Sequence, residues 1–248
     1  MDGKRSMEYF YTPPNLVTAH ELTIDGDEFN HLTHVMRKRQ GDSIRVVNGT
    51  GTAYDVTIVE ISKHIARCEI LKAYVRLHEP EADVTLGVAV LKNGSRFDFL
   101  VEKATELGVN TIVPLRTERS IPHHAKADRL QKLALAAMKQ SGRCVLPAVK
   151  GLTAFAEFLQ SGDPESLRII AHEQIEFPTL AQVVSGKDFR SVTLCIGPEG
   201  GFTEGEVSLA NEAGFQAVSL GVRRLRTETA AIVATGVLLA YGDRHLPP

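Results

Sequence analysis

The chain of 248 residues has few cysteines, no long apolar run and no large excess of either sign of charge. Its three cysteines, Cys68, Cys144 and Cys195, have neither paired nor metal-binding spacing, so we expect them to be reduced core residues. No apolar run approaches the ~20 residues that span a membrane, and no secretory apolar segment is recognisable, which predicts a cytoplasmic protein. The net charge of -2 argues against a chain that binds nucleic acid over its whole surface, but it is compatible with local basic faces.

The common nucleotide-binding and hydrolase motifs are also missing. The sequence has no glycine-lysine phosphate loop, no dinucleotide-binding G-x-G-x-x-G motif, no G-x-S-x-G nucleophile turn and no kinase signature. Gly49-Thr50-Gly51 lies between two strand-like runs and is predicted to be a hairpin turn. His123 and His124 have no third ligand at a useful spacing, so we expect no metal site.

The composition, with 43% hydrophobic residues, is that of a folded protein that divides into two domains, which we place at residues 1–77 and 78–248. The first domain is predicted to be mostly β, because β-branched runs are joined by short polar turns. The predicted strands are residues 44–47, 54–61 and 65–75. A helix that begins near Asp25 is expected to carry Phe29, Leu32, Val35 and Met36 on one face. A small barrel with one helix would close such a domain.

The second domain alternates short apolar strands with helices, which is typical of an α/β fold with a parallel sheet. The predicted strands are residues 84–91, 111–115, 167–171, 192–196 and 217–220. A helix from Phe97 to Leu107 is expected to end at Gly108. The last predicted helix, residues 230–241, is apolar on most faces and must be buried in a core or at a subunit interface.

Two loops near the C-terminus are the most informative part of the chain. Residues 196–202, Ile-Gly-Pro-Glu-Gly-Gly-Phe, follow an apolar strand and precede a helix that Thr203 and Glu206 should open with a capping box. Residues 220–230 form a second loop of the same kind, with one glycine and three arginines. Because glycine lets a ligand approach the backbone closely, these loops could hold a flat heterocycle. A tight structural turn would explain Gly197 and the cap equally well, but it does not require Glu199 or Gly200-Gly201.

Both loops resemble the signature loops of the bacterial 16S rRNA uracil N3-methyltransferases, the RsmE family of the SPOUT class. Three further strings agree with the family in the same order: Lys103-Ala104-Thr105-Glu106-Leu107-Gly108-Val109, Arg119-Ser120, and Gln140-Ser141-Gly142-Arg143 followed by Pro147. The likeness spans essentially the whole chain, with Arg224 where the family usually has an aliphatic residue and Asn48 where aspartate is common. The resemblance implies a PUA-like β-barrel RNA-binding domain followed by a SPOUT methyltransferase domain with a C-terminal trefoil knot. General folding rules would not predict the knot, because threaded chains are rare.

The resemblance also implies the cofactor S-adenosyl-L-methionine, a homodimer with the cofactor near its interface, and methylation of N3 of a specific uridine in 16S rRNA of the small ribosomal subunit. The loop Ala171-His172-Glu173 would complete the cofactor site. The expected cofactor-binding residues are His172, Ile196, Gly197, Glu199, Gly200, Gly201, Leu220, Gly221, Leu225, Arg226, Thr229 and Ala230.

Methyl transfer to uracil N3 requires alignment of donor and acceptor and the removal of one proton, with no metal. Positive charge near the uracil carbonyl oxygens would stabilise the anion, and Arg226 and Arg143 are the candidates for this role. Glu199, Glu228 and Glu106 are candidates either to accept the proton or to orient those arginines. Each of these pairs could equally be a salt bridge that stabilises a loop.

RNA contacts are expected from basic clusters, because phosphate neutralisation supplies most of the affinity. Arg129, Lys132, Lys139 and Arg143 have the spacing of one helix face. The full set of expected RNA-binding residues is Arg37, Lys38, Arg39, Arg119, Arg129, Lys132, Lys139 and Arg143. Any one such cluster can also be an ordinary solvated face.

Two alternatives to the uracil N3 reaction stay open at this level. A knotted methyltransferase of this kind could act on ribose 2′-hydroxyls or on another RNA base. The chain could also be a non-catalytic RNA-binding protein whose two loops are structural only.

Overall fold

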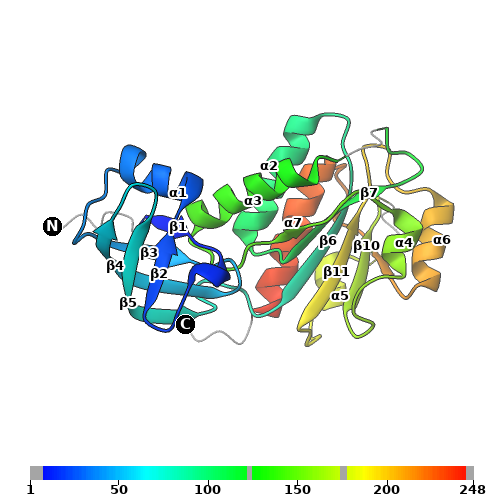
Figure 1. Ribbon diagram of the computed structural model, residues 1–248. Coiled ribbons are helices and arrows are strands. Elements are labelled where there is room, and N and C mark those ends of the chain that lie inside the picture. Colours follow the sequence, from blue (N-terminus) through cyan, green and yellow to red (C-terminus); the bar gives the residue numbers. More distant parts are fainter. Residues whose placement is uncertain (1–7, 122–124, 174–177, 244–248) are drawn as a thin grey trace. The chain divides into compact units, whose positions relative to one another are not determined.

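The computed structural model describes residues 8–121, 125–173 and 178–243, and the chain forms two compact units (Figure 1). The first consists of Met1–Glu79 with Met138–Leu146, and the second of Pro80–Ala137 with Pro147–Pro248. The sequence suggested a single boundary after residue 77. The structure adds a later segment to the first unit, because Val145 forms backbone bridges with Gly49 and Thr50 in the turn between two strands.

The first unit is built on a five-stranded sheet in the order β1-β3-β4-β5-β2. Its strands are β1 (Tyr9–Tyr11), β2 (Glu21–Ile24), β3 (Ser43–Val47), β4 (Thr52–Ile61) and β5 (Ala66–Val75). The three longest strands were predicted, whereas β1 and β2 were not. The edge strands approach one another, since the Thr12 hydroxyl, just after β1, donates a hydrogen bond to the Thr23 carbonyl in β2. The sheet is therefore curved so that its two edge strands meet, as in a barrel.

One short helical segment covers the core of the first unit. It consists of α1 (Gly26–Asn30) and the π-helical turn η2 (His31–Val35), and a separate 3-10 turn, η1 (Pro14–Leu16), follows β1. Phe29 and Leu32 are buried as predicted, but Val35 is 66% exposed. The prediction for Val35 was wrong because the π-helical hydrogen bond from Met36 to His31 widens the turn and rotates Val35 away from the sheet.

The second unit is built on a parallel sheet in the order β12-β10-β11-β6-β7-β8, with β9 also paired to β7. The strands are β6 (Asp83–Ala89), β7 (Thr111–Arg116), β8 (Ala148–Val149), β9 (Thr153–Ala154), β10 (Leu167–Ala171), β11 (Ser191–Ile196) and β12 (Gln216–Val218). All five predicted strands are present, each close to its predicted bounds. The predicted parallel α/β arrangement is therefore confirmed for this unit.

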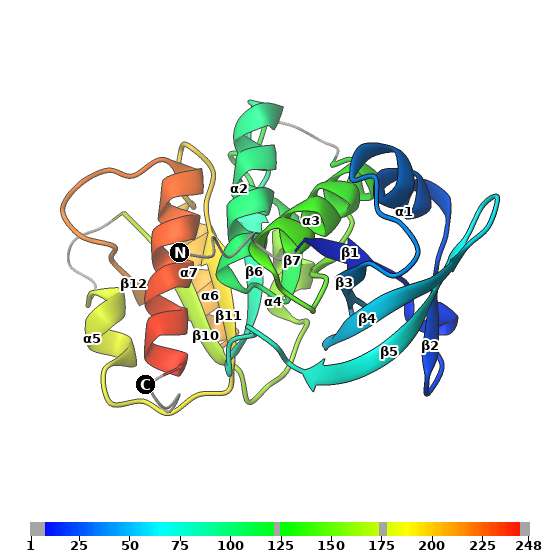
Figure 2. The same cartoon turned by 90° about the vertical axis from the view of Figure 1, so that its left-hand side faces the viewer.

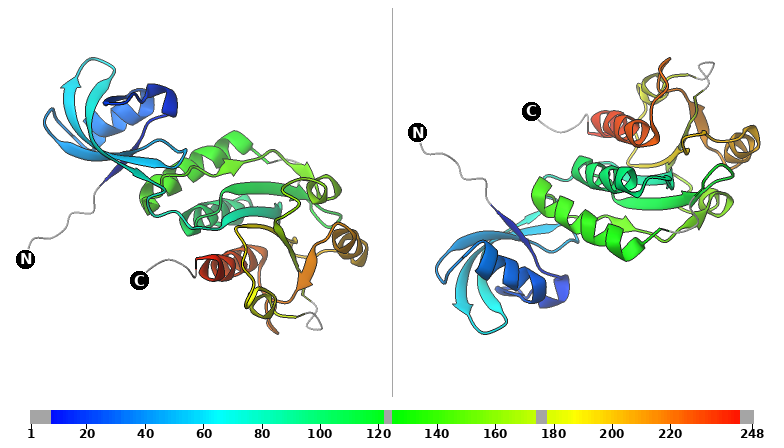
Figure 3. Two further views of the ribbon diagram at one scale, coloured as in Figure 1. Left: turned by 90° about the horizontal axis from the view of Figure 1, so that it is seen from below. Right: turned by 90° about the horizontal axis from the view of Figure 1, so that it is seen from above.

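Helices cover both faces of the parallel sheet. They are α2 (Gly94–Leu107), α3 (Ala127–Ser141), α4 (Phe155–Leu159), α5 (Leu180–Val184), α6 (Glu204–Glu212) and α7 (Thr227–Gly242). Figure 2 shows α2, α5 and α7 in front of the sheet with α6 behind it, and the two views of Figure 3 show the same layers along the sheet. A cluster behind the sheet joins Phe158 of α4 and Ala210 of α6 to Ile170 and Cys195 of the strands.

Local signals set the ends of several helices. Thr203 caps α6 with both hydrogen bonds of the predicted capping box, and Gly108, at φ 122°, ends α2. The last helix begins at Thr227, three residues before its predicted start, and it is only partly buried: Leu238 is buried while Val233 is 43% exposed. The three cysteines are free and buried. Among the described helices, none combines the length and the apolar character needed to cross a bilayer.

Candidate functional site

Three loops at one edge of the parallel sheet form a pocket of about 210 Å³. They follow the carboxyl ends of β10, β11 and β12, strands that lie side by side in the sheet. Because the strands are parallel, their carboxyl ends meet at one edge, which is where α/β proteins bind ligands. The lining residues are Ala171, His172, Glu173, Gly197, Pro198, Glu199, Gly201, Phe202, Leu220, Gly221, Val222, Arg223, Arg224, Leu225 and Thr227.

The loop after β11 is shaped by its glycines. Gly201 has a φ of 69°, and its N–H donates a hydrogen bond to the Pro198 carbonyl at 2.9 Å, which closes a tight turn. A Cβ on Gly197 would lie 3.1 Å from the backbone nitrogen of Phe202. Phe202 itself is buried and anchors the end of the loop. Gly197 and Gly201 therefore let the loop fold tightly on itself, because a side chain at Gly197 would collide with Phe202 and the backbone of Gly201.

The three loops are tied together by Arg224. Its Nη2 donates to the carbonyl of Glu199 at 3.1 Å, and its Nε lies 3.7 Å from a carboxylate oxygen of Glu173. The His172 N–H donates to the carbonyl of Val218, at the end of β12. The resemblance led us to expect an aliphatic residue at this position, whereas Arg224 links the β12 loop to the other two loops.

A second arrangement of charges lies beside this pocket, around Arg96 near the start of α2. The Arg96 guanidinium donates two hydrogen bonds to the Glu228 carboxylate, from Nε at 2.7 Å and from Nη2 at 2.6 Å. Its remaining Nη1 donates to Glu199 at 3.3 Å. The hydrogen bonds from Arg96 lower the pKa of Glu228, and the same pairing raises the pKa of Arg96. Both groups are therefore charged at neutral pH.

The predicted cofactor-binding residues divide into two groups. Those that line the pocket are His172, Gly197, Glu199, Gly201, Leu220, Gly221 and Leu225. Those that do not line it are Ile196, Gly200, Arg226, Thr229 and Ala230. Ile196 is buried at the end of β11, the Gly200 carbonyl accepts a hydrogen bond from Arg119, and Arg226 lines a neighbouring cavity.

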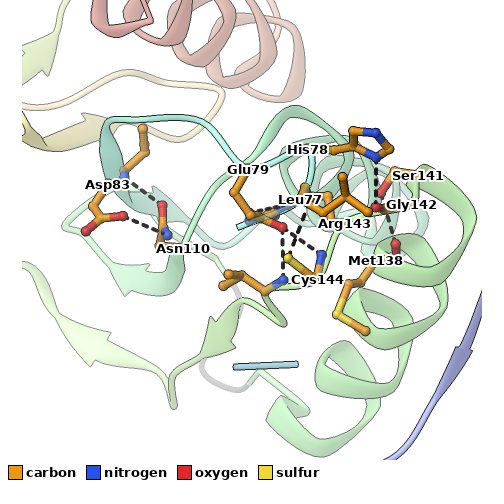
Figure 4. Close-up of polar contacts among 12 residues, drawn as sticks. Leu77, His78, Glu79, Asp83, Asn110, Met138, Ser141, Gly142, Arg143 and Cys144 are labelled. Carbon is orange, nitrogen blue, oxygen red and sulfur yellow. Dashed lines mark hydrogen bonds and ion pairs between the residues drawn. The ribbon is translucent and has the colours of Figure 1, made fainter. Parts of the chain in front are cut away.

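Arg143 lies in the first unit, where its side chain is 2% exposed and ion-paired with Glu79 (Figure 4). Its Nη2 and Nε donate to one Glu79 oxygen at 2.7 and 3.1 Å. The other Glu79 oxygen accepts the backbone N–H groups of Cys144 and Val145 at 2.8 and 2.9 Å. This enclosed network corrects the expectation that Arg143 faces RNA or substrate. It also lies beyond Ser141, the last residue of α3, and so cannot continue the predicted helical stripe.

The remaining basic residues expected at RNA differ in how strongly they are already paired. Ion pairs join Lys38 to Glu8 at 3.1 Å and Lys139 to Glu28 at 2.7 Å. Arg129 forms two hydrogen bonds of 2.6 Å with Asp98 and is 61% exposed in its side chain. Arg37, Arg39, Arg119 and Lys132 are exposed as well, and Arg119 donates a hydrogen bond to the Gly200 carbonyl.

The sequence reasoning missed Arg96 and Glu79 as residues that organise the structure. Arg96 lies in the first turn of α2, after the strand β6 and before the segment of residues 103–109 that resembles the family. A charged residue soon after the end of a strand was the sequence feature that could have marked it as a site residue. Glu106, an alternative proton acceptor, instead pairs with Lys103 on α2 at 2.7 Å. Within the described ranges, no three histidine, cysteine, aspartate or glutamate side chains are grouped as a metal site would require. His123 and His124 lie outside the described residues.

Comparisons with known proteins agree with this architecture. Residues 78–239 match the family described as RNA methyltransferase domain, and residues 24–71 match the RNA methyltransferase PUA domain. The class of protein is thus an RNA methyltransferase with a PUA domain.

Similarity to individual proteins identifies the family more specifically. The chain is 32% identical to the ribosomal RNA small subunit methyltransferase E of Synechocystis, over 89% of this chain and 73% of that protein. It is 29% identical to the protein of the same name from Bacillus subtilis, over 92% and 93% of the two chains. A crystal structure of this methyltransferase from Neisseria gonorrhoeae, bound to S-adenosyl methionine, has a TM-score of 0.85 with 33% identity, and the match covers 95% of this chain and 98% of that one. The chain belongs to the ribosomal RNA small subunit methyltransferase E family.

Proposed function

We propose that this protein transfers the methyl group of S-adenosyl-L-methionine to N3 of a specific uridine in the 16S rRNA of the small ribosomal subunit. The observation that carries the proposal is the pocket between the three loops, which contains seven of the residues expected to bind the cofactor: His172, Gly197, Glu199, Gly201, Leu220, Gly221 and Leu225. The similarity to a family member bound to S-adenosyl methionine supports the same assignment.

The residues of the pocket fit this cofactor. Gly197 and Gly201 contribute backbone to the pocket lining, which suits hydrogen bonds to the edge of an adenine ring, and Leu220 and Leu225 add apolar surface. The pocket lining carries two carboxylates, Glu173 and Glu199, and two guanidinium groups, Arg223 and Arg224, which suits a ligand that carries both a positive sulfonium and a carboxylate. When bound, the cofactor supplies an activated methyl group.

Residues of the chain must accept the proton from uracil N3 and stabilise the negative charge that develops on the base. Glu199 lines the pocket and is 43% exposed in its side chain, so it is available to accept the N3 proton from a docked base. Arg226 lines the cavity beside it, where its positive charge would stabilise the uracil anion. Arg143 is proposed to brace the first unit instead, since its guanidinium is already bonded to Glu79.

The substrate and assembly are part of the same proposal. Exposed Arg37, Arg39, Arg119 and Lys132 would contact RNA phosphates, with Lys38, Arg129 and Lys139 contributing charge from within ion pairs. The apolar helix α7 leaves Val233 43% exposed, which suits a homodimer packed through this helix. The trefoil knot and a cytoplasmic location follow from the family likeness.

Nucleoside mass spectrometry tests the reaction. Small-subunit RNA from a strain that lacks the gene should contain no 3-methyluridine at the target, and purified protein with S-adenosylmethionine should restore it. Unchanged 3-methyluridine would refute the proposal, and loss of a ribose-methylated or other base-methylated nucleoside would favour the alternative enzymes. Calorimetry with S-adenosylhomocysteine separates the non-catalytic alternative, which predicts no binding.

A further inference from the structure

A cavity of about 420 Å³ adjoins the cofactor pocket and is lined by Arg96, Glu199, Arg224, Leu225 and Arg226. We refer to it as the arginine cavity. It shares Glu199, Arg224 and Leu225 with the pocket between the three loops, so the two spaces are neighbours and Glu199 lines both. Three guanidinium groups and one carboxylate around a small space are the polar groups that recognise the edge of a base.

The orientation of Arg96 is fixed from one side. Glu228, in the first turn of α7, has a side chain that is only 9% exposed and binds Nε and Nη2 of Arg96 in the bidentate manner. A bidentate pair fixes the plane of a guanidinium as well as its position. Nη1 is left on the opposite edge, where it lies 3.3 Å from Glu199 Oε1. Glu228 therefore aims one donor edge of Arg96 at the carboxylate that lines both spaces.

This geometry matches the imide edge of uracil. That edge presents one N–H donor, at N3, between two carbonyl acceptors. A carboxylate flanked by guanidinium donors presents the complementary order of acceptor and donors. Cytosine has an acceptor at N3, so it would leave the Glu199 carboxylate facing a lone pair, and a site built to accept a hydrogen bond disfavours a base that cannot donate one.

We propose, on the basis of the function proposed above, that the arginine cavity holds the target uracil and that Arg96 is a specificity-determining residue positioned by Glu228. Glu199 accepts the N3–H, Arg96 Nη1 donates to one uracil carbonyl oxygen, and Arg226 donates to the other. The N3 proton passes to the Glu199 carboxylate. N3 then forms a bond to the methyl carbon as the carbon–sulfur bond breaks and its electron pair goes to sulfur, which leaves a neutral thioether.

The test compares Arg96→Gln, Arg96→Lys and Glu228→Gln with wild type and with Lys187→Gln. Lys187 is an exposed cation of the same unit, hydrogen-bonded to Gln216, so its variant controls for the loss of one positive charge. Small ribosomal subunits from the gene-deletion strain serve as substrate, the initial rate of 3-methyluridine formation is measured at saturating S-adenosylmethionine, and calorimetry gives S-adenosylhomocysteine affinity.

We expect Arg96→Gln to lower the methylation rate by about 100-fold, as for loss of one donor to a developing anion, with S-adenosylhomocysteine affinity within about threefold of wild type. Arg96→Lys and Glu228→Gln should fall between this variant and wild type, and Lys187→Gln should match wild type. The rate of Arg96→Gln should recover more steeply with rising pH than the wild-type rate, because N3 then loses its proton to solvent.

Two results would overturn the inference. If Arg96→Gln methylates at the wild-type rate, the cavity does not read the base through Arg96. If it mainly loses S-adenosylhomocysteine affinity and keeps the wild-type pH profile, Arg96 is a brace for the cofactor loops. A failure of the proposed function looks different, because wild-type protein would then form no 3-methyluridine at all.

Discussion

Removal of Arg143 should destabilise the first unit strongly while leaving the chemistry of the second unit intact. Arg143 and Glu79 are 2% and 0% exposed in their side chains, so each charge has been taken out of water and depends on the other. Substitution of Arg143 by Met leaves the Glu79 carboxylate with the N–H groups of Cys144 and Val145 but without its counter-charge. Breaking a buried pair in this way costs about 3–5 kcal/mol.

A double-mutant cycle measures the interaction free energy between Arg143 and Glu79. Glu79→Gln should also cost several kcal/mol, roughly within the range for a broken buried pair, because an amide N–H then faces the Arg143 guanidinium. The double variant Arg143→Met with Glu79→Gln keeps an amide oxygen for the two backbone N–H groups and contains no buried charge. We therefore expect it to cost less than the sum of the single changes, by roughly 1–3 kcal/mol.

The chain offers its own probe for this experiment. It has no tryptophan and five tyrosines, and Tyr9, Tyr11, Tyr54 and Tyr74 all belong to the first unit. Tyrosine emission during urea unfolding therefore reports mainly on that unit. A cost below about 1 kcal/mol, or strict additivity of the two changes, would refute the reasoning from a desolvated pair. A folded Arg143→Met protein of normal stability that had lost its activity would restore a catalytic role for Arg143.

Three further predictions follow from backbone geometry and titration. Gly108→Ala should lower the unfolding free energy by more than about 2 kcal/mol in thermal denaturation, because φ is 122° and the new Cβ would lie 2.4 Å from Pro80 Cγ; Gly94→Ala, with open space around it, is the neutral control. Gly201→Ala should weaken S-adenosylhomocysteine binding by roughly tenfold in calorimetry, because its φ of 69° strains any side-chain-bearing residue by about 1–2 kcal/mol; unaltered affinity would contradict the assigned pocket. For Glu228, the lowered pKa in the folded state means that its stabilising contribution is complete above its ordinary pKa of 4.5 and is lost as pH falls through the lowered value. Wild type should therefore exceed Glu228→Gln in urea stability at pH 7 and converge with it on acidification, and a constant difference would be evidence against the pairing with Arg96.

The features that the sequence predicted well are those specified by near neighbours along the chain. The capping box of Thr203 and Glu206 joins residues three apart, and Gly108 ends α2 through its own backbone conformation. The apolar runs at Leu167–Ala171 and Ser191–Ile196 needed only their own composition to be identified as strands. β1 was missed because a strand of three residues has too little pattern to detect.

Contacts between distant residues set the limits of the prediction. Glu79 and Arg143 are 64 positions apart, and Arg96 and Glu228 are 132 apart, so no local pattern could pair them. Arg143 was assigned to a helical stripe from its spacing. Only the end of α3 at Ser141 and the φ of 75° at Gly142 show that the chain has already turned.

By itself, the sequence determined the class of fold, the two glycine-bearing loops and seven of the fifteen residues that line the pocket, because strand composition, caps and glycine positions act over a few residues. The tertiary structure alone decided which charged groups meet. It buried Arg143 against Glu79, and it aligned Arg96 with Glu228 and Glu199 at the edge of the pocket. The physical reason is that an ion pair depends on distance in space and on exclusion of water, and both are set only when separate segments pack together.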